Sequence, residues 1–412
     1  MNETNRVYKN STELMNLAGL PFFMADVVDA CLYGRLNLFL QGDTGSGKTQ
    51  LARDVMSYFP DKSMFVLGRN DMDTRELFQQ INPEFFKALK EGTLEKGVNP
   101  KELTSKINTS LFVVDELPNC VPAVRAQLFN LFDGFMEING QTYPLGKGYS
   151  VGIATGNIGQ KFTESNNDLG RALKDRMHVT IDTDYFKPTA WDTFNILSSN
   201  TNPRVDFGVE QNGDLEKIIL KTHQAIASEE IPFEKLILVN YLIHGLDYVN
   251  LDGRETTKTK MKDAWPNAIT NHGDGSDEAL ILPVSPRAAK SILRLSQAFD
   301  CIAKEKGASD EEVREAYFDS IMQAFKFVGA YSGILNDIKV RENYGNDKYS
   351  AIDAVTQSTR TQYDMQLENI SAGLKMVSKG SKSQNVFDSF TGRWKFMRDF
   401  FDKAVEQQKT GK

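Results

Sequence analysis

Short apolar segments alternate with helical patterns along the first half of the chain. Each apolar segment has the length of one buried strand and ends at a glycine or a polar residue. Between these segments, apolar residues recur at the spacing of an amphipathic helix. Strands that alternate with helices indicate an α/β fold, in which a parallel sheet is flanked by helices. We expect strands at 36–41, 64–67, 111–114, 149–155 and 177–181. We expect helices from Asp26, at 49–58, at 75–96 with a break at Asn82-Pro83, and at 124–135.

A turn signal lies between the last of these helices and the fourth strand. The dipeptide Asn139-Gly140 falls inside the segment 136–143. Asn-Gly favours the tight turns that join two antiparallel strands. We therefore expect a β-hairpin at this point of the α/β core.

The second half of the chain has a different pattern, in which helices follow one another. The helical segments are 215–228, 232–248, 286–306 and 310–327. Between them, the segment 252–277 is polar and contains several glycines, which predicts an exposed insertion. We expect three parts: an α/β core over 1–182, an α-helical lid over 183–330 that carries the insertion, and a helical C-terminal extension over 331–412.

The C-terminal extension has an amphipathic pattern of its own. Phe390, Trp394, Met397 and Phe401 recur at helical spacing, so one helix face is apolar. Either this face packs on the chain's own helical lid, or it docks another protein. Residues 370–412 also carry nine Lys and Arg against four Asp and Glu, a net charge of +5. This charge indicates either a solvated helix face or a basic stretch that keeps a DNA-linked function open.

Composition is typical of a soluble globular protein. Hydrophobic residues make up 40% and charged residues 25% of the chain, which is enough for a sizeable core. No apolar segment is long enough to cross a membrane, and the first residues lack the apolar region of a secretion signal. Cys31, Cys120 and Cys301 are far apart, so we expect no disulfide framework and a cytoplasmic location. The net charge of −7 argues against a nucleic-acid coat protein.

The strongest motif follows the first strand and fits the pattern G-x-x-x-x-G-K-[ST]. Its glycines let the backbone N–H groups converge on phosphate oxygens, and the helix that follows directs its positive end at them. The lysine adds a cation for the β- and γ-phosphates, and the threonine hydroxyl is a ligand for Mg²⁺. The motif therefore predicts a nucleotide site made of Gly42, Asp43, Thr44, Gly45, Ser46, Gly47, Lys48 and Thr49.

A second motif is the strand 111–114, which ends in Asp115 and Glu116. An open α/β sheet places its ligand at the carboxyl ends of its strands. Asp115 would hold Mg²⁺ through water, and Glu116 would act as the general base toward an attacking water. The alternative is a strand that simply ends in two solvated acids.

Four further residues are candidates for the same site. Asn157 follows the strand 149–155 and could orient the attacking water, although Asn also favours a plain turn after a strand. Arg176 and Arg171 precede the last strand, and either could reach the γ-phosphate of a neighbouring subunit. Their alternative role is a surface ion pair, with Asp168 or Asp175 as partner. Arg287 begins a predicted helix after Ser-Pro and could reach back over the nucleotide.

In this order, the motifs resemble AAA+ ATPases, and among them the MoxR/CbbQ-like branch with its dynein-related AAA domain. The resemblance covers about residues 20–330 and rests on the segments 42–49, 114–135, 139–146, 153–157, 172–177 and 285–288. It implies Walker A roles for Lys48 and Thr49 and Walker B roles for Asp115 and Glu116. It also implies that Asn157 is sensor 1, Arg287 is sensor 2, and Arg176, or else Arg171, is the arginine finger. Ile158 and Met177 depart from the family pattern, which usually has Pro and Phe there.

This resemblance implies a function as well as a fold. Members of the branch are ATP- and Mg²⁺-dependent ring ATPases, usually hexamers, that act as chaperones on a partner protein complex. Many work with a von Willebrand factor A domain protein, which here would be a separate chain. The alternative is a DNA-linked AAA+ motor of the restriction-translocase or helicase type, although the net charge makes nucleic acid an unfavourable partner.

Overall fold

A computed structural model gives the structure of the chain. It describes residues 7–69, 77–93, 101–138, 140–157, 169, 171–199, 201–206, 213–251, 253–262 and 277–410. The chain forms two compact units, Met1–Glu229 and Glu230–Lys412. The three-part division expected from the sequence, with boundaries at 182 and 330, stays a prediction.

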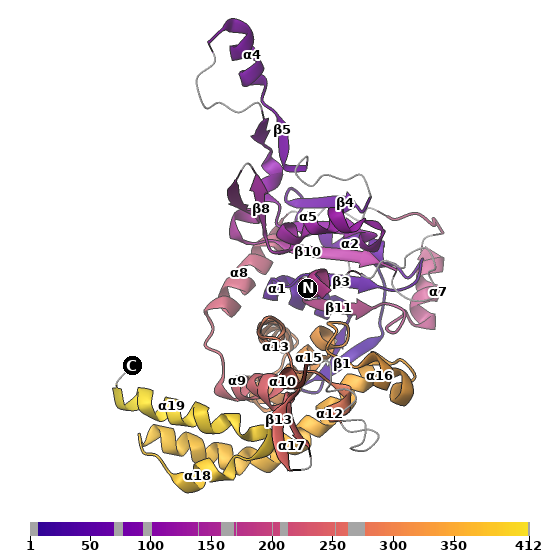
Figure 1. The fold of residues 1–412 in the computed structure, drawn as a ribbon. Helices are drawn as coiled ribbons and strands as arrows, with labels where there is room; N and C mark the ends of the chain where they lie inside the picture. The colour runs from indigo at the N-terminus through magenta and orange to yellow at the C-terminus, as the bar shows by residue number, and fades with distance from the viewer. Residues whose placement is uncertain are drawn as a thin grey trace. The chain divides into compact units, whose positions relative to one another are not determined.

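The first unit is built on a five-stranded sheet in which all neighbouring strands are parallel. The strand order is β11-β3-β10-β7-β4 (Figure 1). Strands β3, β7 and β10 are buried on both faces, as parallel strands flanked by helices usually are. All five strands were predicted to within two residues: β3 Leu38–Gln41, β4 Ser63–Leu67, β7 Leu111–Asp115, β10 Val151–Gly156 and β11 Val179–Asp182.

Helices cover this sheet and fill its core. Phe112 and Val114 of β7 share a buried cluster with Val124 and Leu128 of α5. Side chains alternate along a strand, so Asp115 projects from the opposite face of β7. The helices of this unit are α1 Met24–Gly34, α2 Lys48–Met56, α4 Pro83–Glu91, α5 Pro122–Phe132, α6 Arg171–Lys174, α7 Ala190–Ser199 and α8 Asp214–Ser228, with the short 3₁₀ turns η2 Ser105–Asn108, η3 Leu117–Asn119 and η4 Leu145–Gly148.

The hairpin predicted around residue 140 is present. Strands β8, Phe135–Ile138, and β9, Gln141–Pro144, pair antiparallel. A second hairpin, β1 Glu13–Leu17 with β2 Leu20–Phe23, precedes α1 and was not predicted.

The helix predicted over 75–96, with a break at Asn82-Pro83, is wrong at residues 79–81. Strand β5, Gln79–Ile81, lies there and pairs antiparallel with β6, Lys101–Leu103. Helix α4 begins only after Asn82, whose side chain accepts a hydrogen bond from the Phe85 N–H. The partner strand lies about 20 residues away in sequence, so the local pattern could not reveal the pairing. In Figure 1, β5 and α4 extend away from the sheet beyond β4.

The second unit is mainly helical, as predicted. It also contains a short antiparallel pair, in which β12 joins β13. Among its described residues and those of the first unit, no helix is both long enough and apolar enough to cross a membrane. Its elements are α9 Phe233–Asn240, η5 Tyr241–Gly245, β12 Tyr248–Leu251, β13 Arg254–Thr257, α10 Lys258–Met261, α12 Asp277–Leu280, α13 Pro286–Glu305, α14 Asp310–Glu315, α15 Tyr317–Gly329, α16 Asp337–Tyr344, α17 Lys348–Ser378, α18 Gln384–Ser389, η7 Gly392–Trp394 and α19 Phe396–Thr410.

The apolar face of the C-terminal extension packs inside this unit. The ring of Trp394 lies 4.6 Å from that of Tyr241, and the rings of Phe390 and Phe401 lie 5.5 Å apart. Helices α17, α18 and α19 lie side by side (Figure 1). Packing on the chain's own helices is therefore the correct alternative for this face, and docking of another protein on it is wrong.

The four aromatic and Met positions do not lie on one continuous helix, as their spacing suggested. Helix α18 ends at Ser389, the backbone is extended at Phe390 and Thr391, and α19 begins only at Phe396, after the 3₁₀ turn η7.

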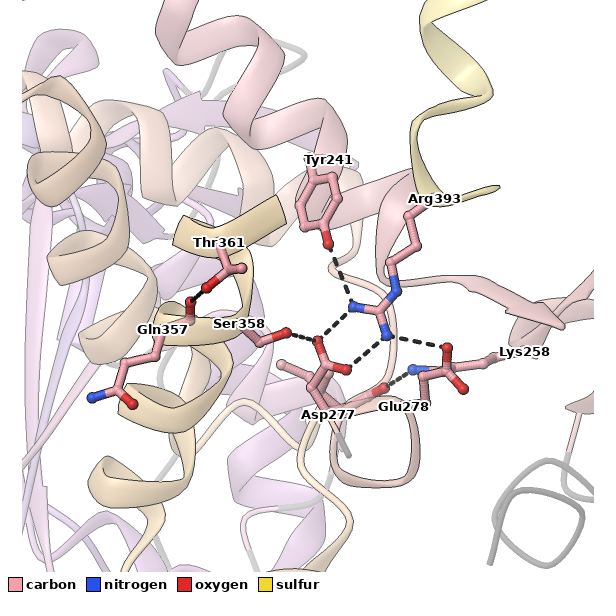
Figure 2. A network of polar contacts seen from close by, with 9 residues as sticks. Tyr241, Lys258, Asp277, Glu278, Gln357, Ser358, Thr361 and Arg393 are labelled. Atoms are coloured by element: carbon pink, nitrogen blue, oxygen red, sulfur yellow. Dashed lines mark hydrogen bonds and ion pairs between the residues drawn. The ribbon is translucent and has the colours of Figure 1, made fainter. Parts of the chain in front are cut away.

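Most described residues of the polar insertion are exposed, as predicted, while 263–276 lie outside the described residues. Lys258 and Asp277 are buried and correct the prediction at these two positions. Arg393 donates two hydrogen bonds to the Asp277 carboxylate, at 2.6 and 2.7 Å, and one to Glu278 at 3.2 Å. Ser358 of α17 also donates to Asp277, at 2.8 Å. Figure 2 shows this network, with Lys258 beside it. The C-terminal extension thus holds one end of the insertion in place.

Lys258 lies at the other end of the insertion and is only 2% exposed. Its ammonium donates to the Ile281 carbonyl. Burial and the nearby Arg393 lower its pKa to about 8, while Asp277, Glu278 and Asp247 act in the opposite direction. The unfolded chain therefore binds more protons than the folded chain between pH 8 and the ordinary lysine pKa, so stability rises with pH in that window.

We expect Lys258→Met to remove this rise in stability. Between pH 7 and pH 10 the unfolding free energy of the wild type should gain ~2 kcal/mol relative to the variant. Denaturant titrations would measure it, with Trp191 and Trp265 replaced by Phe so that Trp394 reports on the second unit. If the unfolding free energies of the two proteins changed with pH in parallel, the pKa of Lys258 would not be lowered in the folded chain.

Candidate functional site

The glycine-rich loop predicted to bind phosphate joins the end of β3 to the start of α2. Gly45 and Gly47 have φ values of +85° and +84°, which a residue with a side chain adopts only with strain. Helix α2 begins at Lys48, directly after Gly47. The free N–H groups of its first turn therefore lie at the loop, as in an anion-binding site.

Lys48 lies inside this loop and is largely buried. Its ammonium donates to the carbonyls of Gly42 at 3.0 Å and Asp43 at 2.7 Å, and to the Ser46 hydroxyl at 3.1 Å. Burial lowers the pKa of Lys48, and the carboxylates of Asp184 and Asp115 oppose the shift. The loop thus surrounds the Lys48 ammonium with two carbonyls and a hydroxyl, and none of these three acceptors is a carboxylate.

Thr49 and Asp115 meet as the two motifs predict. The Thr49 hydroxyl donates to Asp115 Oδ1 at 3.0 Å, and the hydroxyl of Thr155 on β10 also donates to this carboxylate. A hydroxyl and a carboxylate within 3.0 Å of each other are oxygen donors of the kind Mg²⁺ prefers. These residues therefore fit a Mg²⁺ ion that would be bound by Thr49 and, through water, by Asp115.

Glu116 ends the strand in an unusual backbone conformation. Its φ of +56° and ψ of +40° lie in the left-handed region, which costs a non-glycine residue ~1 kcal/mol or more. Its N–H donates to the Thr155 hydroxyl at 3.1 Å, and its carboxylate accepts from Asn119 at 2.7 Å. The side chain is exposed beside the loop rather than buried. Asn119 was not among the predicted residues, although its position three residues later on η3 is a local signal.

Asn157 faces the phosphate-binding loop from the end of β10. Its side-chain amide donates to the Thr44 hydroxyl at 3.3 Å. The structure thus brings Asn157 to the loop, and its action on water stays a prediction.

Arg176 is held by the first unit itself. Its guanidinium pairs with Asp133 at 2.8 Å, donates to the Ala172 carbonyl at 2.8 Å, and lies over the Phe129 ring at 4.7 Å. The observed acidic partner is Asp133, which follows α5; of the two aspartates that the sequence suggested, Asp168 lies outside the described residues. The local sequence offered those two because it shows only near neighbours.

The other two arginines have separate positions. The side chain of Arg171 and all of Asp168 lie outside the described residues. Arg287 lies in the second unit, in the first turn of α13, where Ser285 caps the helix by accepting from the Ala288 N–H at 3.2 Å. The helix start predicted at Ser-Pro is confirmed, and a role of Arg287 toward the nucleotide stays a prediction.

Sequence reasoning missed Tyr8, which lies against the loop. A Cβ on Gly47 would come within 2.7 Å of the Tyr8 ring, so this ring packs directly on the loop glycine. The Tyr8 N–H donates to Asp54 of α2 at 2.7 Å, and nearby Asn10 donates to the Phe186 carbonyl at 2.7 Å. No local pattern marks these residues, because their partners lie far along the chain.

The first unit has a five-stranded parallel sheet, a glycine-rich loop before α2 and an aspartate at the end of β7. Together these features define a P-loop nucleotide-binding domain. Residues 37–177 match the family model of the AAA domain (dynein-related subfamily). This part of the chain is therefore an AAA domain of that subfamily, and the resemblance to its MoxR-like branch is confirmed.

One solved structure supports the fold. A crystal structure of a "putative ATPase" from Cytophaga hutchinsonii ATCC 33406 is similar to this chain with a TM-score of 0.53 and 16% sequence identity. The similarity covers 81% of this chain and 88% of that chain. No curated protein matches this chain.

Proposed function

We propose that this protein hydrolyses ATP at the loop 42–49 with the help of Mg²⁺. The observation that carries this proposal is the hydrogen bond between Thr49 and Asp115, because it joins the two motifs at one point. A bound Mg²⁺ would neutralise phosphate charge there. The AAA domain supports ATP as the nucleotide.

Each residue of the site has a role in this proposal. The loop amides and the Lys48 ammonium bind the phosphate oxygens. The Glu116 carboxylate accepts the proton of the attacking water, and the Asn157 amide orients that water. Asp115 keeps Thr49 in place through their hydrogen bond.

We further infer a ring of identical subunits, a hexamer as in many AAA+ ATPases, that remodels or assembles a partner protein complex. In such a ring Arg176, or Arg171, would complete the site of the neighbouring subunit, and Arg287 would sense the nucleotide. A separate von Willebrand factor A domain protein would be the adaptor. The AAA domain supports this inference by resemblance.

We expect Lys48→Ala to weaken ATP binding by ~10²-fold or more, because the loop loses its cation. Calorimetry with ATP would measure affinity, and phosphate release would measure turnover. Lys217→Ala is the matched control, since Lys217 is an exposed lysine that forms an ion pair with Asp214.

Two results would change the proposal. A wild type that neither binds nor hydrolyses ATP would contradict it. Hydrolysis that rises strongly with DNA at ~0.15 M salt would favour the DNA-linked motor. Light scattering with and without ATP would show whether a ring forms.

A further inference from the structure

The chain directly after β11 fastens the phosphate-binding loop. Because β11 pairs with β3, Asp182 lies opposite Gln41, and the next residues run alongside the loop. The Thr183 N–H and hydroxyl both donate to the Gln41 carbonyl, at 2.8 and 2.9 Å. The Asp43 N–H donates to the Asp184 carboxylate at 2.8 Å.

Thr183 also contacts the middle of the loop. Its hydroxyl lies 2.8 Å from that of Ser46, and the Lys48 ammonium lies 3.1 Å from Ser46 Oγ. An ammonium can only donate, and a carbonyl can only accept. The Thr183 proton goes to the Gln41 carbonyl, so the Ser46 hydroxyl must donate to Thr183. The direction of each hydrogen bond is therefore fixed: Lys48 donates to Ser46, Ser46 donates to Thr183, and Thr183 donates to the Gln41 carbonyl.

The fit between Thr183 and the loop is close. Thr183 is 0% exposed, and a Cβ on Gly42 would lie 2.2 Å from its hydroxyl oxygen. Only glycine at position 42 allows this approach. The hydroxyl of Thr183 is thus enclosed by the loop and has no path to a bound nucleotide.

We propose that Thr183 is a positioning residue, which holds Ser46 and the start of the loop in the shape that receives the nucleotide phosphates, with Asp184 as a second point of attachment. This inference rests on the proposed function. A loop held in place before binding loses less conformational freedom when the phosphates arrive. Thr183 acts through Ser46 and Gln41, without touching the ligand.

The test compares two substitutions at Thr183. Thr183→Val keeps the shape and removes the hydroxyl, whereas Thr183→Ser keeps the hydroxyl. We expect Val to weaken ATP binding about tenfold, as the loss of one buried hydrogen bond does, and Ser to stay within about twofold of the wild type. The KM for ATP should rise with the Kd, and kcat should change much less. Thr180→Val, on β11 itself, is the control for losing a buried hydroxyl three residues before Thr183.

Ser46→Ala, alone and combined with Thr183→Val, tests the chain of hydrogen bonds. The two substitutions break the same chain, so the double variant should bind ATP about as weakly as the weaker single variant. Effects that multiply would show that the two hydroxyls act independently and would overturn the inference.

Asp184 gives a test that does not disturb the buried strand, because its side chain is exposed. Asp184→Asn and Asp184→Ala remove the same charge, but only Asn keeps an oxygen for the Asp43 N–H. We expect the Ala variant to bind ATP several-fold more weakly than the Asn variant. If the wild type binds ATP, and Thr183→Val and Asp184→Ala bind it equally well, this inference is wrong while the proposed function stands. A wild type that fails to bind ATP overturns both.

Discussion

Replacing Glu116 by Gln is expected to leave ATP bound and to lower its hydrolysis by ~10²–10⁴-fold. A carboxylate accepts the proton of an attacking water, and a neutral amide does not. The substitution should change little else. The amide oxygen of Gln can accept the same hydrogen bond from Asn119, and the backbone contact of residue 116 with Thr155 does not involve the side chain.

Two measurements on the purified variant would check this expectation. Calorimetry should give an ATP affinity close to that of the wild type, and phosphate release should fall to the background. Glu229→Gln is the matched control, because it makes the same chemical change at an exposed position after α8. Hydrolysis by the Glu116 variant at the wild-type rate would assign the general base to another residue. The variant with ATP bound would also serve to test for the partner protein that the proposed function requires.

Replacing Arg176 by Ala is expected to leave ATP affinity roughly intact and to lower turnover ~10³-fold. This is the size of effect that an arginine finger has in related phosphoryl-transfer enzymes. In the single chain the guanidinium is held by Asp133 and lies over Phe129. These contacts would fix the residue for use by a neighbouring subunit.

Mixing subunits separates this role from a structural one. A ring of Arg176→Ala and Lys48→Ala subunits contains sites with an intact loop on one side and an intact arginine on the other, so some activity should return. If activity does not return although subunit exchange is proven, either the site is not shared between subunits or the arginine finger is Arg171.

Asp133→Asn is the structural control for Arg176. It breaks the same ion pair but keeps the guanidinium. We expect it to retain most of the activity. If it loses as much activity as Arg176→Ala, the arginine supports the fold and does not act in trans.

Much of the core could be predicted from the sequence because the relevant signals are local. A buried parallel strand is a short apolar run, and the glycine-rich loop and the acids after β7 are contiguous segments. Parallel topology then brings Thr49 and Asp115 to one edge of the sheet, as observed. The spacing of motifs along one chain was therefore enough to anticipate the centre of the candidate site.

Residues whose role depends on distant partners could not be predicted. Thr183 and Tyr8 reach the loop from far along the chain, and neither lies in a recognisable pattern. The pairing of β5 with β6 was missed for the same reason. Burial of Lys258 could not be foreseen in a polar segment, because its enclosure depends on elements that pack around it. Local propensity describes a segment, whereas these features belong to contacts between segments.

The anchoring of the polar insertion has a consequence for chain length. Lys258 and Asp277 are each fixed by hydrogen bonds within the second unit, and Arg393 holds Asp277 from the C-terminal extension. The two ends of the segment 259–276 are therefore already fixed by other contacts. The entropy of closing a flexible segment between fixed ends grows only with the logarithm of its length, and a doubling costs ~0.6 kcal/mol. At this position, residues can be added to the chain with little effect on the folding equilibrium of the second unit.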